Sequence, residues 1–336
     1  MSRRKFIKTL GAASLTIPLL GFSSQENRDE EIKSIIKPPA LKPGDTIGIT
    51  CPATAVWQME TINKFFDKLK AEGFKLKIGK TITEKYGYFA GTDEVRVKEL
   101  NDFIVDKEVQ AIFCAKGGYG CARLLDMINY DSVRNNPKAI MGFSDITALL
   151  LGINKKAGLV TFHGPVGNSG LNDFTWNSVK SVLIKREESF YENPDKVTIN
   201  KGKAKGILIG GNLSVLTSII GSDYLSSFDK KILFLEDAEE EPYSIDRMLT
   251  QLRLGGFLKN ISGIIFGKCA KCVAEEPDKA FTYEEMIVQN IKPLGIPAFY
   301  NASFGHVENK STLPIGIMAE MDADKGTIQL LESAVS

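Results

Sequence analysis

Short apolar runs alternate with amphipathic segments over the first half of this 336-residue chain. The apolar runs have the length of strands, and apolar residues between them recur at the spacing of a helix. Such alternation favours a parallel sheet with helices on both faces. Strands are predicted at residues 46–50, 76–78, 111–115, 139–143 and 159–162, and helices at 56–71, 93–106, 120–128, 145–156 and 175–185.

A second α/β region follows a mostly polar crossing at residues 193–203. We therefore expect a first domain over residues 41–192 and a second over residues 204–333, each of ordinary domain size. In the second region, strands are predicted at 206–210, 232–236, 263–267, 297–300 and 316–321, and helices at 212–219, 243–254 and 283–290.

The start of the chain is predicted to be a targeting segment. Residues 1–24 have a basic start with Arg3 and Arg4, then a modestly apolar stretch, then small residues. This order is typical of a twin-arginine signal peptide and predicts a periplasmic protein; the alternative is a basic start without a targeting role. The apolar stretch is too short for a comfortable membrane span, so no stable membrane insertion is expected after cleavage. Residues 25–40 are predicted to form a linker.

Charge argues against a nucleic-acid partner. The formal net charge is +1, and loss of residues 1–24, which hold four basic and no acidic residues, would change it to −3. Neither value suggests binding to a polyanion.

The five cysteines favour packing roles over metal binding. Cys51, Cys114 and Cys121 lie in or beside apolar runs and are expected to be buried. Cys269 and Cys272 form a lone C-x-x-C without a second ligand pair, so no metal site is expected. After export this pair could form a labile disulfide, and a structural or incidental role is the alternative to a functional one.

A serine at a strand-to-helix corner is the first candidate for chemistry. Ser144 follows an apolar run and precedes a helical one, and Gly142 permits tight backbone packing there. This layout suits a nucleophile elbow, in which the helix N-terminus supplies N–H groups for an oxyanion. The full Gly-x-Ser-x-Gly motif is not present, since Ile146 occupies the place of the second glycine. The alternative is a serine that caps the helix.

The chain has only two histidines that could serve as a base. His306 lies in a glycine-flanked loop after a predicted strand, where it could equally be a plain exposed residue. His163 ends a strand, and a structural role competes with a substrate contact. Glu236 ends the most apolar strand of the second region, where a half-buried carboxylate could orient an imidazole. The glycine-rich run 116–120 fits neither nucleotide-binding fingerprint, so backbone donors for an oxyanion are the preferred interpretation.

These residues lie in blocks that resemble the LD-carboxypeptidase family of serine peptidases, which includes muramoyltetrapeptide carboxypeptidases and microcin C self-immunity peptidases. The resemblance runs from about Ile36 to Ser333. Its blocks occur here, in the family's order, at 89–96, 115–120, 142–147, 163–165, 210–214, 234–252, 304–306 and 313–316.

The resemblance implies a fold and a catalytic triad. The fold would be an N-terminal class I glutamine amidotransferase-like (flavodoxin-like) parallel sheet domain with a smaller C-terminal swivelling β/α domain. Ser144 would be the nucleophile, His306 the general base and Glu236 the residue that orients it. The oxyanion hole would use the backbone N–H of Asp145 and of a glycine in the Gly117-Gly118 turn.

The implied reaction releases terminal D-alanine from a murein tetrapeptide by hydrolysis of an L-to-D amide bond, without a metal or organic cofactor. Lys116, Tyr119, His163 and Asn212 are the expected substrate contacts. Lys116 stands where the family often has arginine, which puts recognition of a substrate carboxylate in question. A homodimer is compatible with the family.

Two other functions stay open from the sequence. One is a peptidase that cleaves a peptidyl or aminoacyl nucleotide toxin, which an aromatic stacking group in the site would favour; Trp57 and Trp176 could not be placed. The other is a periplasmic binding protein without turnover, because fold alone does not establish function.

Overall fold

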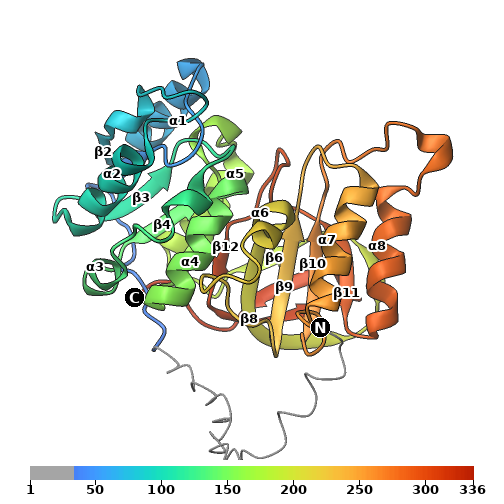
Figure 1. Ribbon diagram of the computed structural model, residues 1–336. Coiled ribbons are helices and arrows are strands. Elements are labelled where there is room, and N and C mark those ends of the chain that lie inside the picture. Colours follow the sequence, from blue (N-terminus) through green and yellow to red (C-terminus); the bar gives the residue numbers. More distant parts are fainter. Residues whose placement is uncertain (1–33) are drawn as a thin grey trace, which may run out of the picture. The chain divides into compact units, whose positions relative to one another are not determined.

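The computed structural model describes residues 34–336, which form one unit with two β-sheets (Figure 1). The predicted signal peptide and residues 25–33 of the predicted linker lie outside the described residues. The fold is mixed α/β. Within residues 34–336, no helix combines the length and the apolar character that a membrane span needs.

The first sheet has the strand order β12-β5-β4-β3-β1-β2. Strands β1 to β5 are parallel, and their order 2-1-3-4-5 is that of flavodoxin-like doubly wound sheets. In such sheets functional groups gather beyond the carboxyl ends of the strands. The strands are β1 (Thr46–Thr50), β2 (Lys75–Ile78), β3 (Ala111–Cys114), β4 (Ala139–Gly142) and β5 (Thr161–His163). The helices are α1 (Met59–Ala71), α2 (Asp93–Val105), α3 (Tyr130–Asn135), α4 (Thr147–Ala157) and α5 (Asp173–Leu183).

The second sheet has eight strands in the order β6-β14-β13-β8-β9-β10-β11-β7. Its central strands β8 to β11 are parallel, and antiparallel strands flank them. The strands are β6 (Phe190–Glu192), β7 (Val197–Asn200), β8 (Lys203–Asn212), β9 (Lys231–Glu236), β10 (Gly263–Gly267), β11 (Ala298–Ala302), β13 (Met318–Asp322) and β14 (Thr327–Leu330). The helices are α6 (Leu213–Ser218), α7 (Pro242–Leu254) and α8 (Tyr283–Ile291).

Strand β12 (Leu313–Ile315) ties the two sheets together. It belongs to the second region of the chain but pairs antiparallel with β5 of the first sheet. Conversely, β6, which lies inside the first predicted segment, pairs with β14 of the second sheet. The loop between β11 and β12 therefore starts at one sheet and ends at the other, and it carries His306 between them.

The helix predicted at residues 120–128 is wrong. Only a 3-10 turn, Cys121–Leu124, forms there. Side chains take the carbonyl groups that a helix would use: Arg96 donates to Gly120 O at 3.1 Å and the Tyr130 hydroxyl donates to Leu125 O at 2.6 Å. The Arg96 bond comes from a distant segment and the Tyr130 bond from five positions further on, so apolar periodicity alone misleads at this position.

Candidate active site

Ser144 lies on a strained corner directly after β4. Its φ angle is 62°, in the left-handed region that side chains rarely adopt and that costs roughly 1–3 kcal/mol. A Cβ on Gly142 would lie 2.8 Å from Ile146 Cγ2, so only glycine allows the chain to turn this tightly. The cap positions of the turn and of α4 are Phe143 and Ile146, not Ser144. The capping alternative is therefore wrong, and the backbone has the geometry of a nucleophile elbow.

The glycine-rich loop after β3 presses against the serine. A Cβ on Gly117 would lie 2.9 Å from Ser144 Cβ, so the Gly117 backbone is in direct contact with the corner. Within residues 34–336, the amide N–H groups of Gly117, Gly118 and Asp145 donate to no protein acceptor. These three donors are thus free to receive an oxyanion. The Asp145 side chain is used structurally, since it accepts the Cys121 N–H at 2.8 Å.

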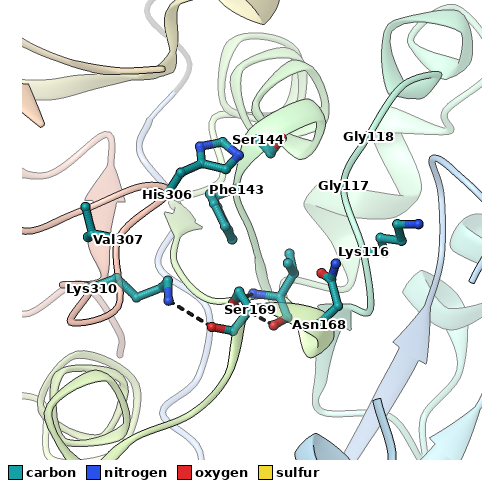
Figure 2. A pocket seen from close by; sticks show the side chains of 11 residues that line it. Lys116, Gly117, Gly118, Phe143, Ser144, Asn168, Ser169, His306, Val307 and Lys310 are labelled. Carbon is teal, nitrogen blue, oxygen red and sulfur yellow. Dashed lines mark hydrogen bonds between the residues drawn. The ribbon is translucent and has the colours of Figure 1, made fainter. Parts of the chain in front are cut away.

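The second sheet contributes a buried carboxylate and an imidazole. Glu236 ends β9 and is 1% exposed. Its Oε2 lies 2.7 Å from His306 Nδ1 and accepts the His306 backbone N–H at 3.3 Å. Two contacts to one carboxylate oxygen hold the ring and its backbone together. The Nδ1 contact leaves Nε2 as the ring nitrogen that is available to a second partner, and Figure 2 shows the imidazole beside Ser144.

The pKa shifts of Glu236 and His306 suit base catalysis. Burial alone would raise the pKa of the Glu236 carboxyl, but the neighbouring imidazoles of His163 and His306 outweigh it and hold the pKa at about 2. Burial alone would lower the pKa of His306, but the Glu236 carboxylate outweighs it and raises that pKa above its usual value. An ionised Glu236 can therefore stabilise the imidazolium that forms when His306 takes a proton.

His163 lies behind this pair instead of in the open site. Its side chain is 1% exposed, and its Nε2 faces Glu236 Oε1 across 3.5 Å. The ring packs at edge-on angles against Phe143, Phe234 and Phe304. A direct contact between His163 and substrate does not fit this position, because the ring is enclosed by aromatic side chains.

Two cavities meet at Ser144 and His306. The lysine cavity, about 460 Å³, is lined by Lys116, Gly117, Gly118, Phe143, Ser144, Val166, Asn168, Ser169, His306, Val307 and Lys310 (Figure 2). The acidic cavity, about 490 Å³, shares Gly118, Ser144 and His306, and adds Asn212, Ser214, Val215, Asp237, Ala238, Glu239, Glu240, Ala270 and Lys271. Both volumes suit a small ligand.

Similarity to known proteins identifies the family. The LD-carboxypeptidase N-terminal domain matches residues 47–164, and the LD-carboxypeptidase C-terminal domain matches residues 205–321. The chain belongs to the LD-carboxypeptidase family. A probable murein peptide carboxypeptidase of Bacillus subtilis (strain 168) is 37% identical over 308 residues, 89% of this chain and 95% of its own length.

Solved structures with the same fold include two kinds of protein. The microcin C7 self-immunity protein MccF, in complex with aspartyl sulfamoyl adenosine, matches with a TM-score of 0.84 at 27% identity, over 90% of this chain and 100% of MccF. A muramoyltetrapeptide carboxypeptidase from Oxalobacter formigenes matches with a TM-score of 0.75 at 27% identity, over 85% of this chain and 97% of the other.

The other predicted contacts of this LD-carboxypeptidase family member lie in different places. Asn212 lines the acidic cavity, donates to Asp237 Oδ1 at 3.0 Å and caps α6. Lys116 lines the lysine cavity, and its amine donates to Ala55 O at 3.1 Å. Tyr119 is 53% exposed, packs its ring against Phe89 and lines neither cavity.

Sequence reasoning missed several residues that line the cavities. Lys310, Asn168 and Ser169 come from loops of the two regions and meet only in the folded chain. The sole signal for Lys310 was its place in the loop that carries His306. Cys269 and Cys272 form a disulfide, and the two residues between them line the acidic cavity. The other three cysteines are buried, as predicted, and the structure shows them as free thiols: Cys51, Cys114 and Cys121.

Proposed function

We propose that this protein is a serine-type LD-carboxypeptidase that releases terminal D-alanine from murein tetrapeptides, with Ser144, His306 and Glu236 as its triad. One observation carries the proposal: a serine in a strained elbow lies beside an imidazole that a buried carboxylate holds at 2.7 Å. A nucleophile, a base and an orienting acid in this order are the parts of an acyl-transfer site.

The proposed reaction proceeds in two halves. His306 Nε2 takes the Ser144 hydroxyl proton while Oγ attacks the carbonyl carbon of the L-to-D amide. The C–N bond then breaks, the leaving amine of D-alanine receives the proton from His306, and an ester joins the peptide to Ser144. His306 then takes a proton from water, the resulting hydroxide attacks the ester carbon, and His306 gives the proton to Ser144 Oγ as the ester bond breaks.

The backbone around the serine suits the charge that develops in this reaction. Each tetrahedral intermediate carries a negative oxygen, and the N–H groups of Asp145 and of Gly117 or Gly118 would stabilise it. Removal of one such donor in an enzyme typically costs on the order of 10²–10³ in turnover. The tight contact between Gly117 and Ser144 supports this assignment.

Several features favour a murein peptide over a nucleotide-linked one. Trp176 is buried, and Trp57 is exposed but lines neither cavity. Phe143 lines the lysine cavity but is 5% exposed and packs edge-on against His163 and His306, so its face is not free to stack on a base. A relative and a solved structure named for murein peptides support this proposal, while MccF, named for microcin C7 self-immunity, also matches the chain. A binding protein without turnover would not need a strained serine, a base and an orienting acid together.

The setting of the reaction is also a proposal. The twin-arginine leader would export the enzyme to the periplasm, where murein is its partner and peptide turnover contributes to cell-wall recycling. The amidotransferase-like relation of the first domain, a swivelling second domain and a homodimer are further expectations from the family. Cell fractionation with and without Arg3 and Arg4 tests the export step.

The first test is mass spectrometry of the mature protein incubated with a disaccharide-tetrapeptide, beside Ser144→Ala. We expect the wild type alone to remove one D-alanine. If no alanine is released, the murein assignment is wrong, and a peptidyl nucleotide becomes the next substrate to try.

A further inference from the structure

Lys310 is a buried cation on the wall of the lysine cavity. The residue is only 3% exposed and lies four positions after His306 in the loop between β11 and β12. Its amine donates to Ser169 O at 3.0 Å and to Glu308 O at 3.3 Å. Figure 2 shows the side chain reaching toward Ser169, on the same cavity as Ser144 and His306.

The ammonium has no counter-ion within the described residues. No carboxylate lies within ion-pair distance of it, and none lines the lysine cavity. Burial lowers the pKa of Lys310, and the charge of the Glu308 carboxylate, which is not in ion-pair contact, only partly opposes this shift. A buried charge without a paired counter-ion is unfavourable. Two carbonyl groups use two of the three N–H donors, which leaves one for a ligand.

Lys116, the other lysine on this cavity, is used differently. Its amine donates to Ala55 O at 3.1 Å. In Figure 2 it is directed away from Lys310 and Ser169, on the far side of the glycine loop. Of the two lysines, Lys310 is therefore the one whose charge faces the cavity across from the serine.

We propose that the lysine cavity binds a carboxylate of the substrate and that Lys310 is its anchor. This inference rests on the proposed function, since it assigns one end of that substrate. The carboxylate has two possible sources in a murein tetrapeptide: the terminal carboxylate of D-alanine, or the side-chain carboxylate of a diaminopimelate-type third residue. Either carboxylate would leave water and form a charge-assisted hydrogen bond with the Lys310 ammonium.

Four synthetic tetrapeptides separate these sources. Their third residue is diaminopimelate or lysine, and their C-terminus is a free acid or an amide. For wild type and Lys310→Gln, kcat/KM is measured on all four. We expect the wild type to prefer the carboxylate-bearing member of one pair by about 10- to 100-fold, and Lys310→Gln to lose that preference. If Lys310→Gln loses the preference for the free acid over the amide, Lys310 binds the terminal carboxylate. If it loses the preference for diaminopimelate over lysine, Lys310 binds the side-chain carboxylate of the third residue.

Two control variants test whether the effect of Lys310→Gln is specific to the Lys310 charge. Lys310→Arg should keep most of the preference. Lys325→Gln, in the exposed turn between β13 and β14, lines neither cavity and should leave all four values unchanged. Equal losses on all four peptides in a folded Lys310→Gln would overturn the inference. Absence of any cleavage by the wild type would instead remove the proposed function itself.

A second measurement needs no variant. Inhibition of the wild type is compared for D-alanine against D-alaninamide, and for diaminopimelate against lysine. We expect the acid of one pair to inhibit at least tenfold more strongly. Equal inhibition within both pairs would overturn the assignment even if Lys310→Gln failed to fold.

Discussion

The two sheets contribute different physics to one site. The first sheet supplies geometry: the strained Ser144, the close contact of Gly117 and the free backbone N–H groups. The second sheet supplies charge: Glu236 and Asp237 at the end of β9, with His306 held against Glu236. This division means that geometry and electrostatics can be broken separately, and that each break should have its own kinetic signature.

The contrast extends to the cavities. The lysine cavity has two lysines and no carboxylate on its wall, whereas the acidic cavity has Asp237, Glu239 and Glu240 beside Lys271. Burial first, and then the nearby Glu236, raise the pKa of Asp237 to about 6. The opposite charges on the two sides of Ser144 indicate that a substrate with unlike ends would bind in one direction only.

The largest effect should come from removing the nucleophile. Ser144→Ala should lower kcat by at least about 10⁴-fold, because only backbone donors and binding would remain. Its thermal unfolding should match the wild type, since φ of 62° is no harder for alanine than for serine. Adding His306→Ala to it should lower kcat little further. Wild-type turnover by Ser144→Ala would refute the assignment.

The second largest effect should come from removing the charge that the second sheet supplies. Glu236→Gln should lower kcat by about 10³- to 10⁴-fold, since a neutral amide cannot stabilise the imidazolium of His306. Steady-state kinetics on the murein tetrapeptide measures this loss. A reduction below tenfold would show that Glu236 does not orient the base.

Breaking the geometry should have a smaller effect. Gly117→Ala would place a Cβ 2.9 Å from Ser144 Cβ, so the loop must shift and its N–H donor with it. We expect a loss of about 10²- to 10³-fold in kcat. Because no titrating group changes, the pH profile of kcat/KM should keep its shape, and a shifted profile would contradict the division between the sheets.

The smallest effect should be a shift in the pH at which kcat/KM falls on the acidic side of its pH profile. His306 must be neutral to accept a proton, so kcat/KM should fall as pH drops through its pKa. Burial lowers that pKa, but Glu236 outweighs burial and raises it, so the wild-type midpoint should lie above the ordinary value of about 6.5. Removal of the negative charge in Glu236→Gln should move the midpoint to lower pH. A midpoint unchanged by this substitution would show that the charge does not act on His306.

Local sequence patterns predicted the elements that depend on neighbours in the chain. The strand runs before Ser144 and Glu236 were recognisable because buried parallel strands are continuously apolar. The corner at Ser144 followed from the order of strand, small residue and helix. By contrast, the three-residue strand β12 is too short to have a pattern. At the predicted helix 120–128, the Gly120 carbonyl accepts from Arg96, which lies 24 positions away in the chain.

The sequence by itself predicted the α/β class, the positions of the main strands along the chain and the three residues that we propose as the triad. Only the tertiary structure decided that His163 is enclosed behind Glu236 and that Tyr119 lies outside the cavities. It also decided that Lys310 is buried with no ion-pair partner among residues 34–336. The physical reason is the separation in sequence between the residues that interact. A strand or a turn is selected by residues a few positions apart, whereas burial and charge neutralisation depend on groups that folding brings together from distant positions. His163 and Glu236 are 73 positions apart in the printed sequence, and Lys310 donates to a carbonyl 141 positions away.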